Sequence, residues 1–308
     1  MALLTARSSG LLEFAAAMVL SGTLGIFVFE SGESSWNVVF FRCFFGALSL
    51  GAYCWAAGLF RARVERRNWV WLSALGGVAI VSNWVLLFSS YRYASISIAT
   101  AVYHTQPFFL LLLSALFFRD RPSLVKLAWI GVAFVGLMLV IEIDQTQFDL
   151  SAEATIGLLL ALGAAILYAV ATIVTRQLKG VPPHLIALVQ VCLGTVLLLP
   201  FASFETVMRP GWHWAFLIGL GVIHTCLMYI LLYSGLQKLP VSAVAVLSFI
   251  YPIVAILVDY ILYGQNLSLL QIAGIGLILL GSAAVNLNLS PFFRFRRRVS
   301  RTESVPAE

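Results

Sequence analysis

The stretch AVYHTQPFFLLLL, residues 101–113, places a titratable ring, an amide and a proline inside a run that is otherwise apolar. A proline in the interior of a helix costs about 3 kcal/mol or more. A buried polar group without a hydrogen-bond partner costs on the order of 2–7 kcal/mol. These costs indicate that the neighbouring parts of the folded protein stabilise the interrupted helix. A second copy of the pattern lies farther along the chain.

The second copy lies 145 positions later, the separation between Pro107 and Pro252. Moving residues 69–136 by this distance, without gaps, aligns Trp69 with Trp214, Leu75 with Leu220, Gly76 with Gly221, Leu86 with Leu231, Ser89 with Ser234, Ser97 with Ser242, Ser123 with Ser268, Gly131 with Gly276 and Gly136 with Gly281. Apolar residues align easily by chance, but Trp, Pro and several Gly in one register do not. The chain is therefore predicted to be a duplication, with repeats at 1–145 and 146–290 and a basic tail at 291–308.

Composition identifies the solvent of the folded chain as lipid. Of 308 residues, 61% are hydrophobic and 10% charged, and the mean hydropathy is +0.98. A soluble domain has roughly 45–50% apolar and about 25% charged residues. Apolar runs of helix-spanning length, too long for barrel strands, lie at about 11–29, 36–59, 69–90, 95–117, 123–141, 155–175, 183–202, 213–234, 241–262 and 269–289.

These runs predict an all-α integral membrane protein with ten transmembrane helices, five in each repeat. Because five is odd, the second copy must cross the membrane in the opposite sense to the first. The two halves are then related by an axis in the membrane plane, which is the inverted repeat of secondary transporters. In such proteins the binding site lies between the halves near the middle of the bilayer.

Basic residues gather on one side of the membrane under this assignment. Ten spans put both termini on the same side, and that side holds 16 of the 19 Lys and Arg residues. The loops of the opposite side hold only Arg92 and Arg209 as basic residues. The positive-inside rule therefore places both termini in the cytoplasm. The tail segment FRFRRR, residues 293–298, is expected to anchor at lipid headgroups and not to bind nucleic acid.

The sequence carries no pattern typical of a cofactor or metal site. Its four cysteines lie inside apolar runs, its four histidines are scattered, and it has no Gly-rich phosphate loop or nucleophile elbow. We therefore expect no metal and no cofactor, and any ATP hydrolysis would require another subunit.

Five stretches of the chain carry a resemblance to a known family: SGTLGIFVFESG (21–32), VVFFRCFFGAL (38–48), SIATAVYHTQPFFLLLLSALFFRDRPSLVKLAWIGVAFVGLMLV (97–140), LGAAILYAVATIVTRQL (162–178) and SAVAVLSFIYPIVAILVDYILYGQNLSLLQIAGIGLILLGSAAV (242–285). They resemble the paired EamA domains of the drug/metabolite transporter superfamily, and the resemblance covers nearly the whole chain. It implies a multi-pass protein of the cell membrane, expected in the bacterial inner membrane. It also implies a cavity lined by spans 1, 3, 4, 6, 8 and 9, and transport, often export, of metabolites such as amino acids. Where many relatives have Trp-Gly in the first span, this chain has Ser21-Gly22.

Polar side chains and prolines coincide on one face of two repeat-related spans. In span 95–117, Tyr103 and His104 share a face with Pro107, and in span 241–262 the corresponding residues are Ser248, Phe249 and Pro252. We expect the rings and the hydroxyl to bind substrate and the two prolines to act in gating. The alternative is that both segments are ordinary kinked helices with locally satisfied polar groups.

Other polar residues inside the spans are secondary candidates for substrate binding: Asn83, Ser90, Tyr168, Thr172 and His224. For each, an interhelical hydrogen bond is the alternative. Two charges lie inside spans, Arg42 and Asp259. We expect Arg42 to pair with Asp259 or with Glu30 in a charge clamp at the outer end of the cavity.

The function predicted from these features is secondary transport of a small metabolite by alternating access, in the export direction. An amino acid or an aromatic or amphipathic compound fits the ring-bearing face. The alternatives are an intramembrane enzyme acting on lipid, with His104 or Asp259 as acid or base, and a membrane subunit that transports nothing itself. The partners are then the small-molecule substrate and the lipid bilayer, with no nucleic acid. The sequence leaves open whether the protein is a monomer or a homodimer.

Overall fold

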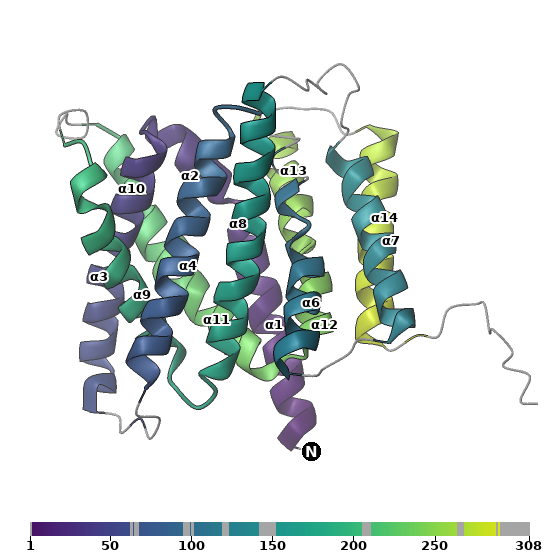
Figure 1. Cartoon of the computed structure of the whole chain (residues 1–308), viewed down its shortest axis with the longest axis horizontal. Helices are drawn as coiled ribbons and strands as arrows, with labels where there is room; N and C mark the ends of the chain where they lie inside the picture. Colours follow the sequence, from purple (N-terminus) through teal and green to yellow (C-terminus); the bar gives the residue numbers. More distant parts are fainter. Residues whose placement is uncertain are drawn as a thin grey trace, which may run out of the picture.

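A computed structural model describes residues 2–61, 64, 68–94, 99, 102–118, 123–141, 152–204, 211–263, 268–287 and 289, and within these ranges the chain forms helices and turns without a strand. Figure 1 shows the helices side by side in one bundle, with α3 and α9 toward one end and α7 and α14 at the other. The helices are α1 (Ala2–Gly22), α2 (Leu24–Ser31), α3 (Ser35–Ala56), η1 (Leu59–Arg61), α4 (Trp69–Ser90), α6 (Gln106–Phe118), α7 (Leu124–Ile141), α8 (Ala152–Gln177), α9 (Pro183–Leu198), η3 (Leu199–Phe201), α10 (His213–Gly221), η4 (Val222–Leu227), α11 (Met228–Lys238), α12 (Val241–Leu247), α13 (Ile250–Tyr263) and α14 (Leu269–Asn286).

The expectation of an all-helical, multi-pass membrane protein is confirmed. In the described ranges, seven helical stretches are long and apolar enough to cross a membrane: Arg7–Ser31, Ser35–Ala56, Trp69–Ser90, Glu153–Gln177, Pro183–Phe201, His213–Lys238 and Val241–Leu262. Three shorter apolar helices are Gln106–Phe118, Leu124–Val140 and Leu269–Val285. Helices dominate because each helix pairs its own backbone N–H and C=O groups. The hydrocarbon of a membrane offers these groups no hydrogen-bond partner.

Four of the expected spans are interrupted within the described residues. Helices α1 and α2 meet at Thr23, a turn at residues 104–105 precedes α6, and α12 and α13 meet at residues 248–249. Between α10 and α11 the chain winds as a π-helix, η4, in which hydrogen bonds join residues five positions apart. The apolar runs therefore predict the spans but not the breaks within them.

Pro107 and Pro252 each lie in the first turn of a helix, as the second residue of α6 and the third residue of α13. A proline fits there because the N–H that it lacks would have no partner within the helix. The backbone carbonyls four positions earlier, those of Tyr103 and Ser248, lose the N–H that would otherwise bond them. The prolines thus begin new helices at matching positions of the two halves.

Helices α7 and α14 approach each other through glycines. A Cβ atom on Gly274 would lie 2.5 Å from the carbonyl oxygen of Gly136, and a Cβ on Gly281 would lie 2.8 Å from that of Trp129. Small residues at such contacts let two backbones come close, which is the main source of packing energy between helices in lipid.

This contact predicts opposite outcomes for two glycines of α14. Gly274→Val should separate the helices and lower the free energy of unfolding by about 1–3 kcal/mol, because the added carbons have no space. Gly276 is exposed, and a Cβ atom added to it would meet no neighbouring atom within 4 Å, so Gly276→Val is the matched control. Melting temperatures of the purified variants in detergent test this, and equal values for the two would contradict the close packing.

Candidate functional site

Three segments bring four aromatic rings, including that of His104, into one cluster. The imidazole of His104 is 1% exposed and stacks on Tyr251 of α13, with ring centroids 5.3 Å apart and 18° between the planes. Tyr103 meets His104 edge-on at 5.7 Å and meets Tyr168 of α8 edge-on at 6.3 Å. Such rings combine an apolar body with a polar tip, so the cluster suits a small molecule that has both apolar and polar parts.

Arg42 of α3 is the largest fully buried side chain in the described part of the protein, at 2% exposure. Its Nε donates to Oγ1 of Thr225 at 3.1 Å, and its Nη2 donates to the carbonyl of His224 at 3.0 Å. The guanidinium carbon lies 4.1 Å from the ring centroid of Trp84 and 5.7 Å from that of Tyr229. Hydrogen bonds and cation–π contacts together replace part of the hydration that the charge lost.

The π-helix η4 explains how backbone oxygen becomes available to Arg42. A π-turn displaces carbonyls from their ordinary α-helical partners, and such turns are frequent at functional sites. Within η4, Thr225 Oγ1 donates to the carbonyl of Leu220, 2.8 Å away and five residues earlier, while the His224 carbonyl accepts from Arg42. Arg42 thereby fastens α3 of the first half to the irregular turn of the second half.

The described contacts of Arg42 differ from the predicted charge clamp. Its acceptors are neutral oxygens of Thr225 and His224, and Glu30 is an exposed residue near the end of α2. Helix η4 thus supplies backbone and hydroxyl oxygens to Arg42 where the sequence predicted a carboxylate. The side chain of Asp259 lies outside the described residues, so a pairing between Asp259 and Arg42 stays a prediction.

Several predicted site residues use their polar groups for helix contacts. Asn83 Nδ2 donates to the carbonyl of Ala164 on α8 at 2.6 Å, which joins α4 to α8. The hydroxyls of Ser90 and Ser248 donate to carbonyls of their own helical segments, at 2.6 and 2.8 Å. The Asn83 bond is the interhelical contact that the sequence offered as the alternative to substrate binding, whereas the Ser90 and Ser248 bonds stay within their own helical segments.

The remaining candidates are buried: Thr172 is 4% exposed, and Phe249 and His224 are 0% exposed. The ring of His224 meets Phe27 of α2 edge-on at 4.6 Å. Thus the structure places Tyr103, His104 and Tyr168 in one cluster and His224 beside Arg42.

Three rings of the site were not among the sequence candidates: Trp84, Tyr229 and Tyr251. Trp84 and Tyr229 lie 145 positions apart, so the shift that aligns the two prolines also aligns these rings. Tyr251 directly precedes Pro252. The 145-position shift therefore carries a signal for Trp84 and Tyr229, whereas it aligns Tyr251 with Gln106 and gives no signal for that ring.

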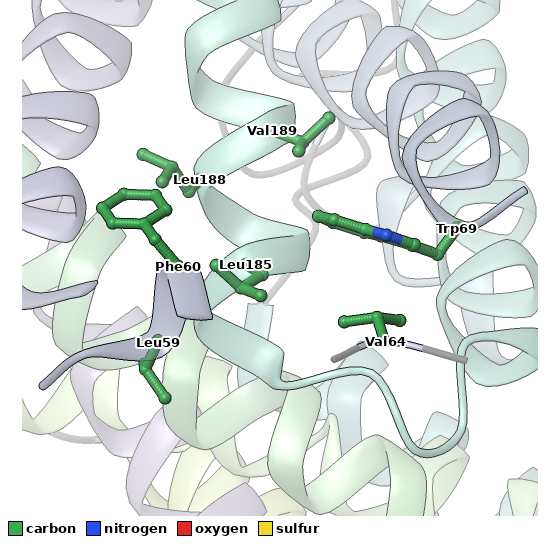
Figure 2. Close-up of a pocket in the computed structure, with 7 residues that line it drawn as sticks. All are labelled: Leu59, Phe60, Val64, Trp69, Leu185, Leu188 and Val189. Carbon is green, nitrogen blue, oxygen red and sulfur yellow. The ribbon is translucent and has the colours of Figure 1, made fainter. Parts of the chain in front are cut away.

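A cavity of about 210 Å³ lies away from these clusters, between η1 and the starts of α4 and α9 (Figure 2). Its lining is apolar: Leu59, Phe60, Val64, Trp69, Leu185, Leu188 and Val189. None of the predicted site residues lines it. In the described part of the chain, no group of three or more His, Cys, Asp or Glu residues could hold a metal ion.

Comparison with known proteins assigns this arrangement to a family. A sequence model of the "EamA-like transporter family" matches residues 8–142 and again residues 155–287. The chain is 30% identical over 280 residues to the "Uncharacterized transporter YxxF" of Bacillus subtilis (strain 168), an alignment that covers 90% of this chain and 89% of that protein. It is 26% identical over 218 residues to the "Threonine/homoserine exporter RhtA" of Escherichia coli (strain K12), covering 69% and 70% of the two chains.

A solved structure described only as "Crystal structure of protein" has a similar fold, with a TM-score of 0.78 at 22% identity. The match covers 92% of this chain and 98% of that one, and at this identity it concerns the fold alone. The two family matches, in contrast, span most of the sequence. The chain therefore belongs to the EamA-like transporter family of the drug/metabolite transporter superfamily.

Proposed function

We propose that this protein is a secondary transporter that exports a small metabolite by alternating access, and that the substrate binds at the ring cluster around His104. The observation that carries the proposal is that this cluster lies where α6 and α13 begin, at matching positions of the two halves. Polar groups at helix breaks are the usual binding elements of secondary transporters. The name of the exporter RhtA supports an amino-acid-like substrate.

The proposal includes ten membrane spans in two inverted halves, residues 1–145 and 146–290, with the termini and the 291–308 tail in the cytoplasm of a bacterial inner membrane. The two family matches, 8–142 and 155–287, support a duplication. Seven long and three shorter apolar helices in the described ranges are consistent with ten spans. The family also favours transport over catalysis on lipid.

Contacts between α7 and α14 support the inversion. The 145-position shift carries Gly136 forward onto Gly281 and carries Gly274 backward onto Trp129. A Cβ on Gly136 would lie 2.6 Å from the carbonyl oxygen of Gly274, and a Cβ on Gly281 would lie 2.8 Å from that of Trp129. One contact therefore becomes the other when the halves are exchanged, as a two-fold axis requires.

A second pair of contacts obeys the same exchange. Gly76 of α4 packs against the Gln190 side chain of α9, and their repeat mates, Gly221 of α10 and Phe45 of α3, also pack together. Each contact joins the third span of one half to the second span of the other. This agreement at a separate place in the bundle supports the proposed symmetry.

Residues close to a two-fold axis contact their own repeat mates. Trp84 and Tyr229 are such mates, and their rings meet edge-on with centroids 5.5 Å apart. The guanidinium of Arg42 lies against both rings. We infer that Arg42 ties the halves together beside the axis, while the helix breaks at Pro107 and Pro252 allow the gate segments to move.

Removing the polar tips of the ring cluster should reduce transport without unfolding the protein. His104→Leu and Tyr103→Leu are expected to lower flux by about tenfold or more, because each removes hydrogen-bonding groups worth about 1–3 kcal/mol to a bound polar ligand. Flux of amino acids and related metabolites through proteoliposomes, with and without a pH gradient, measures this. Tyr260→Leu, at an exposed position of α13, is the control.

Wild-type flux per inserted molecule in both variants would contradict the ring site and move the proposed site to Asn83, Thr172 and His224.

Pro107→Ala and Pro252→Ala should lower the maximal rate of transport more than they raise KM, because they stiffen the gate segments and leave the rings in place. Failure of every compound in the panel to move through correctly folded protein would contradict the transport proposal itself.

Loss of the Arg42 charge should loosen the contact between the halves. Arg42→Gln removes the cation–π contacts and the fork-shaped donor, so we expect a lower melting temperature and lower flux, with Arg42→Lys intermediate. Arg61→Gln, at an exposed arginine of η1, is the matched control. Wild-type stability and flux in Arg42→Gln would contradict this role, and a double-mutant cycle with Asp259→Asn measures any coupling between the two charges.

A further inference from the structure

An ion pair joins α1 to α11 at the end of the bundle where the chain begins (Figure 1). Lys238 Nζ, at the end of α11, pairs with Oε1 of Glu13 on α1. The same Nζ donates to Ser9 Oγ at 3.1 Å, and the Ser9 hydroxyl donates to Glu13 Oε1 at 3.4 Å. Ser9 and Glu13 are four residues apart on α1, so both lie on the side that meets α11. These contacts connect the two halves of the chain, and neither the ring cluster nor the Arg42 contacts use them.

The backbones of α1 and α11 are in close contact beside the ion pair. A Cβ atom on Gly235 would lie 3.1 Å from the carbonyl oxygen of Gly10, and a Cβ on Gly10 would lie 2.8 Å from that of Lys238. Phe14 of α1 and Leu239 after α11 are at most 2% exposed. In the described conformation the two helices therefore leave no passage between them at this end.

Separate hydrogen bonds hold the end of α11 to α8, within the second half. Arg176 of α8 donates from Nη1 to the carbonyl of Leu236 at 3.2 Å and to that of Leu239 at 2.6 Å. The Lys238 ammonium, in contrast, reaches across to the first half. Loss of the ion pair would therefore release α1 from α11 without detaching α11 from α8.

The ion pair has no counterpart at the equivalent contact of the repeat. The 145-position shift carries Ser9, Glu13 and Lys238 onto Ala154, Leu158 and Tyr93. The equivalent segments do meet, because a Cβ atom on Gly157 of α8 would lie 2.7 Å from the Cβ of Ala94, just after α4. Ala154 and Leu158 carry no charge, so these positions cannot form an ion pair. The two equivalent contacts thus differ by one charged interaction.

We propose that Glu13 and Lys238 form a latch, which holds α1 against α11 and favours the conformation closed at this end over the conformation open at it. The inference rests on the proposed transport by alternating access, in which the two ends of an inverted repeat open in turn. A contact that exists in one state and not in the other shifts the population toward the first. Because the repeat mates form no ion pair, the bias acts at one end, which the proposed topology places in the cytoplasm.

Cysteine labelling measures how often this end opens. In full-length protein with its native cysteines replaced by alanine, Leu239→Cys places a single thiol at the buried contact. Glu13→Gln and Lys238→Met should each raise the rate at which this thiol reacts with a soluble maleimide by about two- to fivefold, the range expected for a partly exposed ion pair. Glu153→Gln, at an exposed glutamate of α8, is the matched control and should leave the rate unchanged.

Charge reversal separates a specific latch from general damage to the fold. Glu13→Lys and Lys238→Glu should each raise the labelling rate, and the double variant should lower it again, because it restores the pair with its charges exchanged. A second reporter, Ser90→Cys, replaces the repeat mate of Gly235, a residue that is 0% exposed. Its labelling should stay equal or fall when the latch is broken.

Three results would overturn the latch: unchanged labelling of Leu239→Cys in the single variants, no recovery in the double variant, or equal increases at both reporters. The labelling needs no substrate, so its outcome is independent of the compound that the protein carries. Absence of flux for every compound, together with the expected labelling, would contradict the transport proposal and support the latch as a contact between two conformations.

Discussion

The backbone of a membrane-spanning segment must satisfy its hydrogen bonds inside the protein, and this chain interrupts its helices nonetheless. A hydroxyl residue accompanies each described interruption. Thr23, Thr105, Ser248 and Thr225 each donate to a carbonyl three to five residues earlier. At three of these breaks the carbonyl, that of Leu20, Val102 or Val244, also accepts from the backbone N–H of the same hydroxyl-bearing residue. The hydroxyl therefore adds a second local donor at the break, and the hydrogen bonds stay within the turn.

The same breaks determine where polar chemistry collects. Rings at the start of α6 and α13 meet around His104, and the π-turn of η4 offers a carbonyl to Arg42. A buried charge next to neutral oxygens and aromatic faces is solvated without a carboxylate partner in the described contacts. The irregular backbone of η4 thus supplies a hydrogen-bond acceptor for Arg42, a role that an acidic side chain would otherwise have to fill.

Composition and periodic patterns are sufficient to predict the class of this protein and most of its helices, because the length of an apolar run is a direct consequence of bilayer thickness. They also locate Pro107 and Pro252 as break points. The π-helix η4 escapes prediction, since the segment VIHTCL contains neither proline nor glycine. For the same reason the contact of Arg42 with a backbone carbonyl is invisible in the sequence, where a search for partners finds only side chains such as Glu30 and Asp259.

The close contact between α7 and α14 has a mechanical consequence. Each of two glycines seats a side chain of the partner helix, with Leu277 over Gly136 and Val140 over Gly274. A slide of one residue along the helix axis, about 1.5 Å, would drive these side chains into backbone atoms. A second close approach, of Gly281 to the Trp129 carbonyl, lies farther along the same pair of helices. The two contacts together resist any sliding of α7 along α14, so the pair is expected to move as one unit.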